Sequence, residues 1–202
     1  MCGRYEILDG RRIFLRFQVA NITPDMLSNL DVRPTQQVPA LLTDHQLHLM
    51  KWGLVPSWAK DPSVGVKMIN ARAEGIAEKP SFKRPLRTQR CLLPASAFFE
   101  WHSEAGSKTA KVKYRIARKD GDMFALAGLY DVWKSPNGAE LTTCTIITCQ
   151  PNAVMAPIHN RMPVILKPED EDAWLDPDMT EVEEITSYLQ PCPDELLEAL
   201  PA

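Results

Sequence analysis

The sequence predicts an α+β fold, with one antiparallel, curved or barrel-like β-sheet at its core and helices at its periphery. Strong hairpin signals recur along the chain, and seventeen prolines limit the length of any helix. The sequence has neither a βαβ rhythm nor a glycine-rich phosphate loop, which argues against a doubly wound nucleotide-binding fold. No repeat, low-complexity tract or flexible linker divides the 202 residues, so we expect a single domain over residues 1–202.

The N-terminal part predicts one short helix followed by a hairpin. Residues 10–18 (GRRIFLRFQ) fit a helix. Its apolar side chains share one face: Ile13, Phe14 and Phe17. Residues 38–43 and 47–55 are apolar runs on either side of the polar pair Asp44-His45, a pattern typical of a hairpin.

Two further hairpins are expected in the second half of the chain. Residues 112–118 and 123–130 flank Asp120-Gly121, a strong type I′ turn signal. Asn137-Gly138 leads into the β-branched run LTTCTIITC, which favours another hairpin.

The C-terminal part predicts a helical tail from about residue 168. Pro168, followed by two acidic residues, suits the first turn of a helix. Residues 181–189 and 194–200 also have helical patterns. Together with the hairpins, these segments complete the α+β prediction.

The charge distribution limits the classes of partner. The formal net charge is −3, so the chain is not a basic DNA-coating protein and any nucleic-acid site must be local. Five cations lie close together in the sequence: Lys79, Lys83, Arg84, Arg87 and Arg90. Such a run is by itself most often a solvated face. No apolar run approaches the roughly 20 residues that span a bilayer. The N-terminus lacks the apolar segment of a secretory signal, so we expect a cytoplasmic protein with no membrane partner.

The five cysteines do not indicate a metal site or a disulfide framework. They form no CxxC pair and no Cys/His cluster with zinc spacing, and their number is odd. Cys91, Cys144 and Cys149 lie in or beside apolar runs and are interpreted as small buried hydrophobes. We expect no metal and no organic cofactor.

Cys2 follows the initiator methionine directly, which gives it a distinctive chemistry if Met1 is removed. An α-amine has a pKa of about 7.7–8.0, against about 10.4 for lysine, so much more of it is neutral and nucleophilic near pH 7. That amine can form a Schiff base with an aldehyde, and the thiol of the same residue can then close a five-membered thiazolidine. The alternative is that a chance residue follows methionine.

Glu100 and His159 are candidates for proton transfer. In ASAFFEWH an extended backbone places Glu100 on one face with Phe98, so desolvation should raise the pKa of its carboxyl group. A rim carboxylate paired with a cation is the alternative for Glu100. His159 lies on a constrained turn between Pro157 and Pro163 and could shuttle protons, although a surface histidine is commoner.

Several other residues near these candidates suit nucleic-acid binding. Asn70 could fix a substrate hydroxyl, although asparagine more often caps a turn. Three arginines adjoin the candidates and suit phosphate groups: Arg4, Arg72 and Arg161. Trp52 and Trp58 could stack on bases, with core packing as the alternative for both.

Together these segments resemble the SOS-response-associated peptidase-like (SRAP) family. The resemblance runs in family order from residue 1 to about residue 175. The matching stretches are MCGRY at the start, RPTQQVP at 33–39, KWGLVPSWAKD at 51–61, MINARAE at 68–74, KPSF at 79–82, RCLLPASAFFEW at 90–101, FALAGLYDVW at 124–133, IITCQPN at 146–152 and IHNRMPVIL at 158–166.

The resemblance implies the SRAP fold and covalent binding of abasic sites in single-stranded DNA, with lesions at junctions between single- and double-stranded DNA as the expected partner. By matching position, Cys2 would be the nucleophile, Asn70 would orient it, and Glu100 and His159 would move protons. Arg72 and Arg161 would hold phosphates, Arg4 and Thr148 would make lesser contacts, and Trp58 would limit how far a duplex reaches. A monomer is expected, associated with the nucleoid when bound to damaged DNA.

Two other functions remain open on the sequence. A cysteine peptidase could use Cys2 as nucleophile and His159 as base, in its simplest form removing its own first residue. A non-catalytic DNA- or protein-binding module could use the basic run and the tryptophans. The covalent reaction of Cys2 with an abasic site would also allow a lyase side reaction that cleaves the DNA strand.

Overall fold

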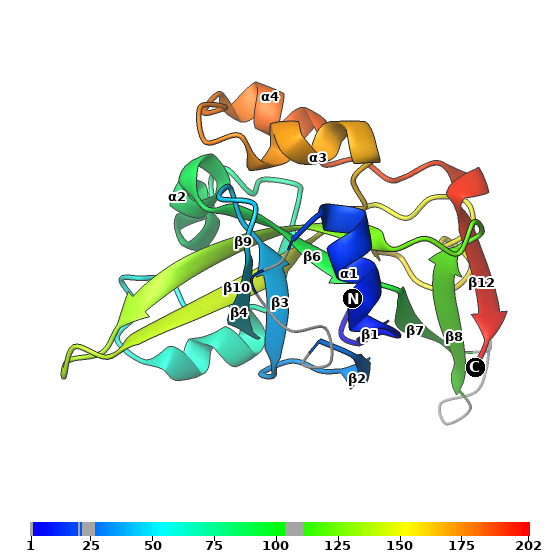
Figure 1. Ribbon diagram of the computed structural model, residues 1–202, viewed down its shortest axis with the longest axis horizontal. Coiled ribbons are helices and arrows are strands. Elements are labelled where there is room, and N and C mark those ends of the chain that lie inside the picture. The colour runs from blue at the N-terminus through cyan, green and yellow to red at the C-terminus, as the bar shows by residue number, and fades with distance from the viewer. Residues whose placement is uncertain (1, 20, 22–26, 104–110) are drawn as a thin grey trace.

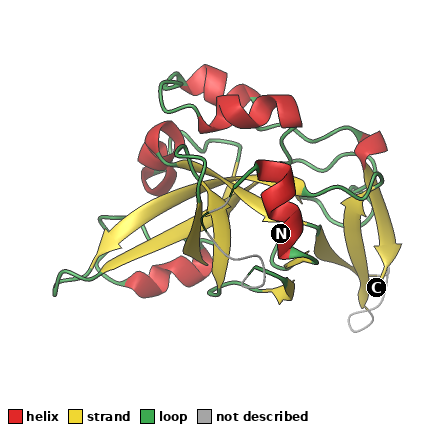
Figure 2. Ribbon diagram, viewed as in Figure 1, coloured by secondary structure: helices red, strands yellow, loops and turns green. Residues whose placement is uncertain are grey.

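The computed structural model describes residues 2–19, 21, 27–103 and 111–202 (Figure 1). Its elements form two β-sheets with the helices around them (Figure 2). This arrangement confirms the predicted α+β class with a barrel-like core. Within the described residues, no helix is long and apolar enough to cross a membrane.

The larger sheet closes into a five-stranded barrel. Its strands are β3 (Gln37–Leu41), β4 (Leu47–Trp52), β6 (Arg90–Ala95), β9 (Phe124–Lys134) and β10 (Glu140–Cys149). They follow the order β10-β4-β3-β6-β9, and β9 then pairs back onto β10. Two short strands, β5 (Asn70–Arg72) and β11 (Met162–Pro163), extend the sheet along β10. Closure leaves the barrel with few unpaired edges.

Most pairs in the barrel are antiparallel, as predicted, but β10 pairs in parallel with both β4 and β5. Gly128 of β9 shows how tightly the interior is packed. A Cβ at that position would lie 2.2 Å from Leu93 Cδ1, a distance that no real side chain tolerates. A larger residue would displace the Leu93 side chain and lie only 3.0 Å from the Thr145 carbonyl oxygen, so glycine fits best where β9 pairs with β6.

The second sheet is open and antiparallel. Its order is β12 (Leu197–Pro201), β8 (Lys111–Arg118), β7 (Ala97–Ser103), β1 (Tyr5–Ile7) and β2 (Asn29–Val32). Strand β6 of the barrel passes into β7 through Ser96, whose backbone N–H donates to Glu6 O at 2.8 Å. The two sheets thus share one continuous hydrophobic core.

The helices are short and peripheral (Figures 1 and 2). They are α1 (Gly10–Phe17), α2 (Pro80–Thr88), α3 (Pro168–Leu175) and α4 (Val182–Ser187), with 3₁₀ turns η2 (Pro62–Lys67) and η3 (Asp194–Leu196). Asp9 caps α1 by accepting a hydrogen bond from Arg11 N. The predicted helix at 10–18, the hairpin around Asp44-His45, the Asn137-Gly138 hairpin and the helix from Pro168 are all confirmed.

The hairpin predicted around Asp120-Gly121 is wrong. The turn itself forms, with Gly121 at φ +72° and its N–H bonded to Arg118 O. However, β8 pairs with β7 and β12, whereas β9 pairs with β6 and β10, so both edges of each strand are already occupied. The chain therefore changes sheets at this turn.

The helix predicted at 194–200 is also wrong. Only Asp194–Leu196 form a single 3₁₀ turn, and Leu197–Pro201 form strand β12. Five residue pairs join β12 to β8, from Leu197 with Arg118 to Pro201 with Tyr114. Pairing with the otherwise open edge of β8 overrides the helical propensity of this segment.

Candidate functional site

Four of the expected site residues come from segments that are far apart in sequence. Cys2 precedes β1, Asn70 begins β5, Glu100 lies in β7, and His159 lies in the loop before β11. Strand β1 pairs with β7, and Phe99 N donates to Arg4 O at 2.9 Å, which brings the N-terminal segment beside Glu100. Strand β10 pairs in parallel with β5 on one edge and antiparallel with β11 on the other, and Thr148 pairs with both. The pairing therefore brings all four residues to one place.

Cys2 and Asn70 are in direct contact. Asn70 Nδ2 donates to the backbone oxygen of Cys2 at 2.9 Å, while the buried Oδ1 of Asn70 accepts no hydrogen bond from the described part of the chain. Cys2 has no exposed surface. Burial, and secondarily the nearby Glu100 carboxylate, raise the pKa of the Cys2 thiol well above its ordinary value. At neutral pH this thiol is therefore protonated.

Glu100 is a buried carboxyl group, with only 3% of the residue exposed. It lies on the same face of β7 as Phe98, which is fully buried. Burial raises the pKa of the Glu100 carboxyl, and the charge of His159 acts in the opposite direction. The sequence-based expectation of a raised pKa at this position is thus confirmed.

His159 faces Glu100 across 4.0 Å, measured from Nε2 to Oε2. Its other ring nitrogen, Nδ1, lies 3.1 Å from the backbone N of Arg161 and 3.2 Å from its O. A backbone N–H can only donate, so a protonated Nδ1 would place two N–H donors opposite each other. When Nδ1 accepts from the Arg161 N–H, the proton of the neutral ring lies on Nε2, the nitrogen that faces Glu100.

Arg161 is almost buried and firmly held. Its Nη1 and Nη2 donate to the two carboxylate oxygens of Glu74, each at 2.8 Å, and Nη2 also donates to Thr148 O at 2.6 Å. The side chain of Arg161 is 8% exposed, whereas that of Glu74 is 51% exposed. The ion pair with Arg161 lowers the pKa of the Glu74 carboxyl. Sequence reasoning missed Glu74, although its position two residues after Arg72 was a usable signal.

The remaining candidate DNA contacts differ in exposure. Arg72 is exposed, and Thr148 is fully buried. Arg4 is bonded to Asp31, and its guanidinium lies 5.8 Å from the centre of the Trp101 ring. The structure brings Arg4, Arg161 and Thr148 close to the four central residues through β1, β10 and the loop before β11.

The two tryptophans have opposite environments. Trp52 is fully buried and donates from Nε1 to Ile69 O, so it belongs to the core. Trp58 is 62% exposed. Its neighbours are anchored: Ser57 N donates to the buried Asp131 carboxylate at 2.9 Å, and Ala59 O accepts from Trp133 Nε1 at 2.7 Å. An exposed aromatic ring on a fixed loop can act as a stacking platform.

The basic run at 79–90 does not form a uniform cationic face. Arg90 is buried, and its guanidinium donates to four backbone oxygens. Arg84 is paired with Asp131, and Arg87 donates to Thr180 O. Three of these five cations therefore have structural partners.

The other cysteines are structural. Cys91, Cys144 and Cys149 are buried as predicted, and Cys192 is buried too. Burial raises the pKa of Cys149 and of Cys192 to about 12, so both are inert thiols at neutral pH. Among the residues that the structure describes, no group of three or more His, Cys, Asp or Glu side chains could hold a metal ion.

The fold and the site together define an α+β barrel protein in which a buried cysteine and a buried glutamate lie beside a half-buried histidine, around the N-terminal segment. Over residues 1–202 the chain matches the family model described as SOS response associated peptidase (SRAP). The chain belongs to this family.

Named relatives and solved structures agree with this assignment. The abasic site processing protein YoqW of Bacillus subtilis is 43% identical, over 98% of this chain and 91% of that protein. The abasic site processing protein HMCES of Gallus gallus is 37% identical, over 63% of this chain and 44% of that protein. A crystal structure of a Bacteroides thetaiotaomicron protein superimposes with a TM-score of 0.92 at 30% identity, covering 99% of this chain and 91% of that one. One from Bordetella bronchiseptica, at 22% identity and a TM-score of 0.83, shows the same fold, with 100% of this chain and 99% of that one covered.

Proposed function

We propose that this chain processes abasic sites in single-stranded DNA by forming a covalent cross-link through Cys2 after removal of Met1. The observation that carries the proposal is the chain of contacts from Asn70 to Cys2, with Glu100 beside the thiol and His159 beside Glu100. The abasic site as substrate is taken from the names of the relatives, which are abasic site processing proteins.

The proposed reaction has two steps. The Cys2 α-amine adds to the aldehyde carbon of the ring-opened sugar, and the carbonyl oxygen leaves as water to give an imine. The Cys2 sulfur then bonds to the imine carbon, the C=N bond becomes single, and the thiol proton ends on nitrogen. The α-amine, with a pKa of about 7.7–8.0, is partly neutral near pH 7 and is the group that adds to the aldehyde first. β-Elimination from the imine would be the strand-cleaving side reaction.

Each neighbour of Cys2 has a role in this scheme. Asn70 holds the Cys2 backbone in place and keeps its Oδ1 for the sugar. Glu100, with its raised pKa, donates the proton that the departing oxygen needs, and afterwards takes the thiol proton and passes it to the nitrogen. His159 presents Nε2–H toward the same carboxylate and would protonate the sugar oxygen during ring opening and reversal.

DNA binding would rest on the groups around this centre. Arg72 and Arg161 would contact the phosphates that flank the lesion, and Arg4 and Thr148 would make lesser contacts with the DNA. Trp58 would stack on the end of a duplex and so favour a junction. The shielding of a lesion in damaged DNA, as part of an SOS-type response, is the cellular role that this chemistry fits.

The test compares three proteins with an oligonucleotide that carries one abasic site. Wild type should give an adduct that survives heat and SDS, with a mass equal to the two components less one water. Cys2→Ala keeps the α-amine and should give an adduct only when the imine is trapped with borohydride. Cys192→Ala is the matched control, a buried thiol far from Cys2 in sequence, and should behave as wild type. A stable adduct from Cys2→Ala without borohydride would overturn the proposal.

The peptidase alternative is less well supported by the geometry. A cysteine peptidase needs a thiolate beside its histidine, whereas the Cys2 thiol has a raised pKa and His159 faces Glu100. The intact mass of Cys2→Ala separates the two cases. Loss of Met1 from that variant would show external processing, since alanine also permits aminopeptidase trimming. Retention of Met1 in the variant alone would favour self-cleavage.

A further inference from the structure

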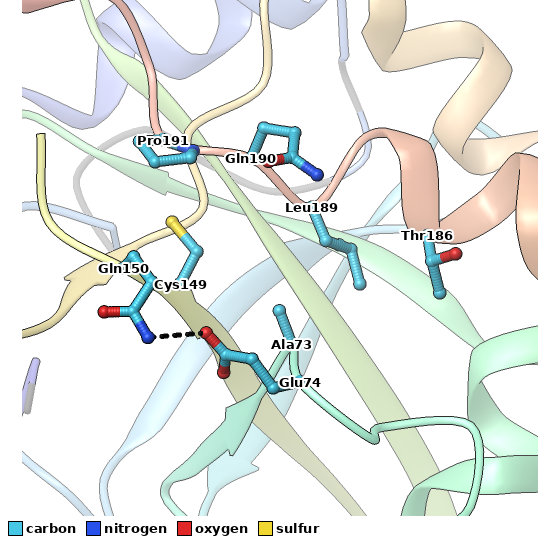
Figure 3. A pocket seen from close by; sticks show the side chains of 8 residues that line it. All are labelled: Ala73, Glu74, Cys149, Gln150, Thr186, Leu189, Gln190 and Pro191. Carbon is cyan, nitrogen blue, oxygen red and sulfur yellow. Dashed lines mark hydrogen bonds between the residues drawn. The ribbon is translucent and has the colours of Figure 1, made fainter.

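A surface cavity of about 310 Å³ lies beside the candidate site (Figure 3). Its polar wall contains Glu74, Gln150, Thr186 and Gln190, and its apolar wall includes Leu189 and Pro191. The first two residues follow β5 and β10, and the others belong to α4 and the segment after it. The cavity therefore lies between the barrel and the C-terminal helical region.

The parallel strands β5 and β10 lead from the candidate site into this cavity. Asn70 begins β5, Arg72 at its end pairs with Thr148, and Ala73 N then donates to Thr148 O at 2.8 Å. The segments that follow β5 and β10 therefore start side by side. Glu74 then contacts Arg161 on one side and lines the cavity on the other. A phosphate bound near Arg161 would thus lie next to the mouth of the cavity.

The chemistry of the walls suits a planar, uncharged ring with hydrogen-bonding edges. The one ionised group among the lining residues is Glu74, and its charge is already paired with Arg161. A second phosphate would find no cation there. Gln150 is anchored by a hydrogen bond from Nε2 to Glu74 Oε1 at 3.3 Å, and its carboxamide oxygen is left as an acceptor. Glutamine and glutamate side chains are the groups that read the edges of adenine and cytosine, and apolar walls pack on the ring faces.

We propose that this cavity binds the nucleobase of the nucleotide immediately flanking the abasic site, on the side whose phosphate lies at Arg161. This inference rests on the proposed function, because it places the same DNA strand across both sites. A volume of about 310 Å³ is at the small end of ligand pockets, which fits one base rather than a whole nucleotide.

The experiment uses oligonucleotides that differ only at the two positions next to the lesion. In one set, the base on either side is removed by a stable tetrahydrofuran spacer, and the rate of cross-linking is measured. Removing the base on one side should slow cross-linking roughly tenfold, the effect of one good base contact, and removing the other should change it little. In a second set, 2-aminopurine flanks a tetrahydrofuran that cannot react, and its fluorescence should change on binding.

Two matched substitutions test whether the cavity is responsible. Thr186→Phe fills the cavity. Thr142→Phe adds the same ring near the start of β10, at the opposite end of that strand from Cys149, and this threonine is also half-buried. Both the dependence on the flanking base and the 2-aminopurine signal should disappear in Thr186→Phe and persist in Thr142→Phe. Urea unfolding checks that both variants are folded, and Gln150→Ala, at an exposed position, gives an independent weakening without added bulk.

The outcomes separate this inference from the proposed function. Cross-linking that ignores both flanking bases, or a flank effect that persists in Thr186→Phe, overturns the base site while leaving the covalent chemistry intact. A 2-aminopurine signal that is lost in Thr186→Phe, in a protein that forms no adduct, supports the base site and overturns the covalent proposal.

Discussion

At the scale of single residues, Glu100 is a position where stability and the proposed chemistry oppose each other. A carboxylate that is 3% exposed loses most of its hydration, and this burial raises its pKa. The folded state therefore binds the Glu100 proton more tightly than the unfolded state does. The stabilisation is fully present below the unfolded pKa and is lost as pH rises through the folded pKa. Above its folded pKa, the ionised side chain destabilises the fold.

Glu100→Gln should consequently be more stable than wild type near pH 8, with a difference that shrinks as pH falls toward about 4.3. The same variant should form the abasic-site adduct about 100-fold more slowly, because it can neither donate nor accept the proton. Urea unfolding at several pH values and a cross-linking time course measure the two effects. The exposed Glu195→Gln is the control and should change neither. A Gln variant less stable than wild type near pH 8 would contradict this account of the burial.

Glu74 illustrates the opposite sign. The hydrogen bonds from Arg161 lower the pKa of its carboxyl group. The stabilisation is present above the unfolded pKa and is lost as pH falls through the folded value. Glu74→Gln should therefore lower the free energy of unfolding by about 1 kcal/mol at neutral pH, a modest value because the Glu74 side chain is half-exposed.

The difference between Glu74→Gln and wild type should diminish below about pH 4, where the wild-type carboxyl group begins to protonate. Urea midpoints at neutral and acidic pH measure it. Glu78→Gln, at an exposed glutamate four residues further along, should leave the midpoint unchanged. A constant difference across the whole pH range would mean that the ion pair is not its origin.

At the scale of elements, the loop that carries Trp58 is fixed by buried groups on either side. Asp131 is 2% exposed and accepts hydrogen bonds from Ser57 N, Val132 N and Arg84. The backbone at Gly53, just before this loop, is also constrained. Gly53 has φ +129°, and a Cβ there would lie 2.6 Å from Gly65 O, so the backbone approach requires glycine.

This arrangement predicts that Trp58→Ala and Asp131→Ala weaken binding of single-stranded DNA through the same feature. Trp58→Ala should reduce affinity about tenfold, the value of one stacked base, with little change in stability. Asp131→Ala should also destabilise the fold by about 2–3 kcal/mol, since it leaves buried donors without partners. The double variant should bind no more weakly than the weaker-binding single variant, because the two effects are not independent. Fluorescence anisotropy provides the affinities, and Val66→Ala, at another exposed apolar residue, is the control.

At the scale of the whole molecule, local signals predicted most elements but not how the strands combine. Asn137-Gly138 specified its hairpin because the turn and the two strands are adjacent in sequence. Asp120-Gly121 carried the same signal, yet its strands joined different sheets, since their partners come from distant segments. The strand at Leu197–Pro201 was likewise decided by the free edge of β8 and not by its own propensity.

The sequence indicated the central residues of the candidate site but not the residues that hold them in place. Cys2, Glu100 and His159 have side chains whose chemistry is visible in the sequence. Glu74 and Asp131 act through contacts with Arg161 and Ser57, which are 87 and 74 positions away. Such contacts depend on the folded chain. The cavity beside Glu74 could not be anticipated either, because the barrel and the C-terminal helical region form it together.

The charge of the whole molecule determines how its DNA binding should respond to salt. With a net charge of −3, attraction to DNA must come from a local group of arginines. The proposed contacts are Arg4, Arg72 and Arg161, and each phosphate neutralised on a single strand contributes a slope of about −0.7 to log K against log salt. Three contacts predict a slope of about −2. Arg72→Ala, which removes the most exposed of the three, should reduce its magnitude by about 0.7.

Anisotropy of a tetrahydrofuran-containing strand, titrated between about 50 and 200 mM salt, measures this slope without covalent reaction. Arg87→Ala is the matched control. Arg87 belongs to the basic run and already donates to Thr180 O, so its removal should leave the slope unchanged. If the basic run on α2 were the true DNA contact, the outcome would reverse. Arg87→Ala would then lower the slope and Arg72→Ala would not, which would move the DNA path away from Cys2.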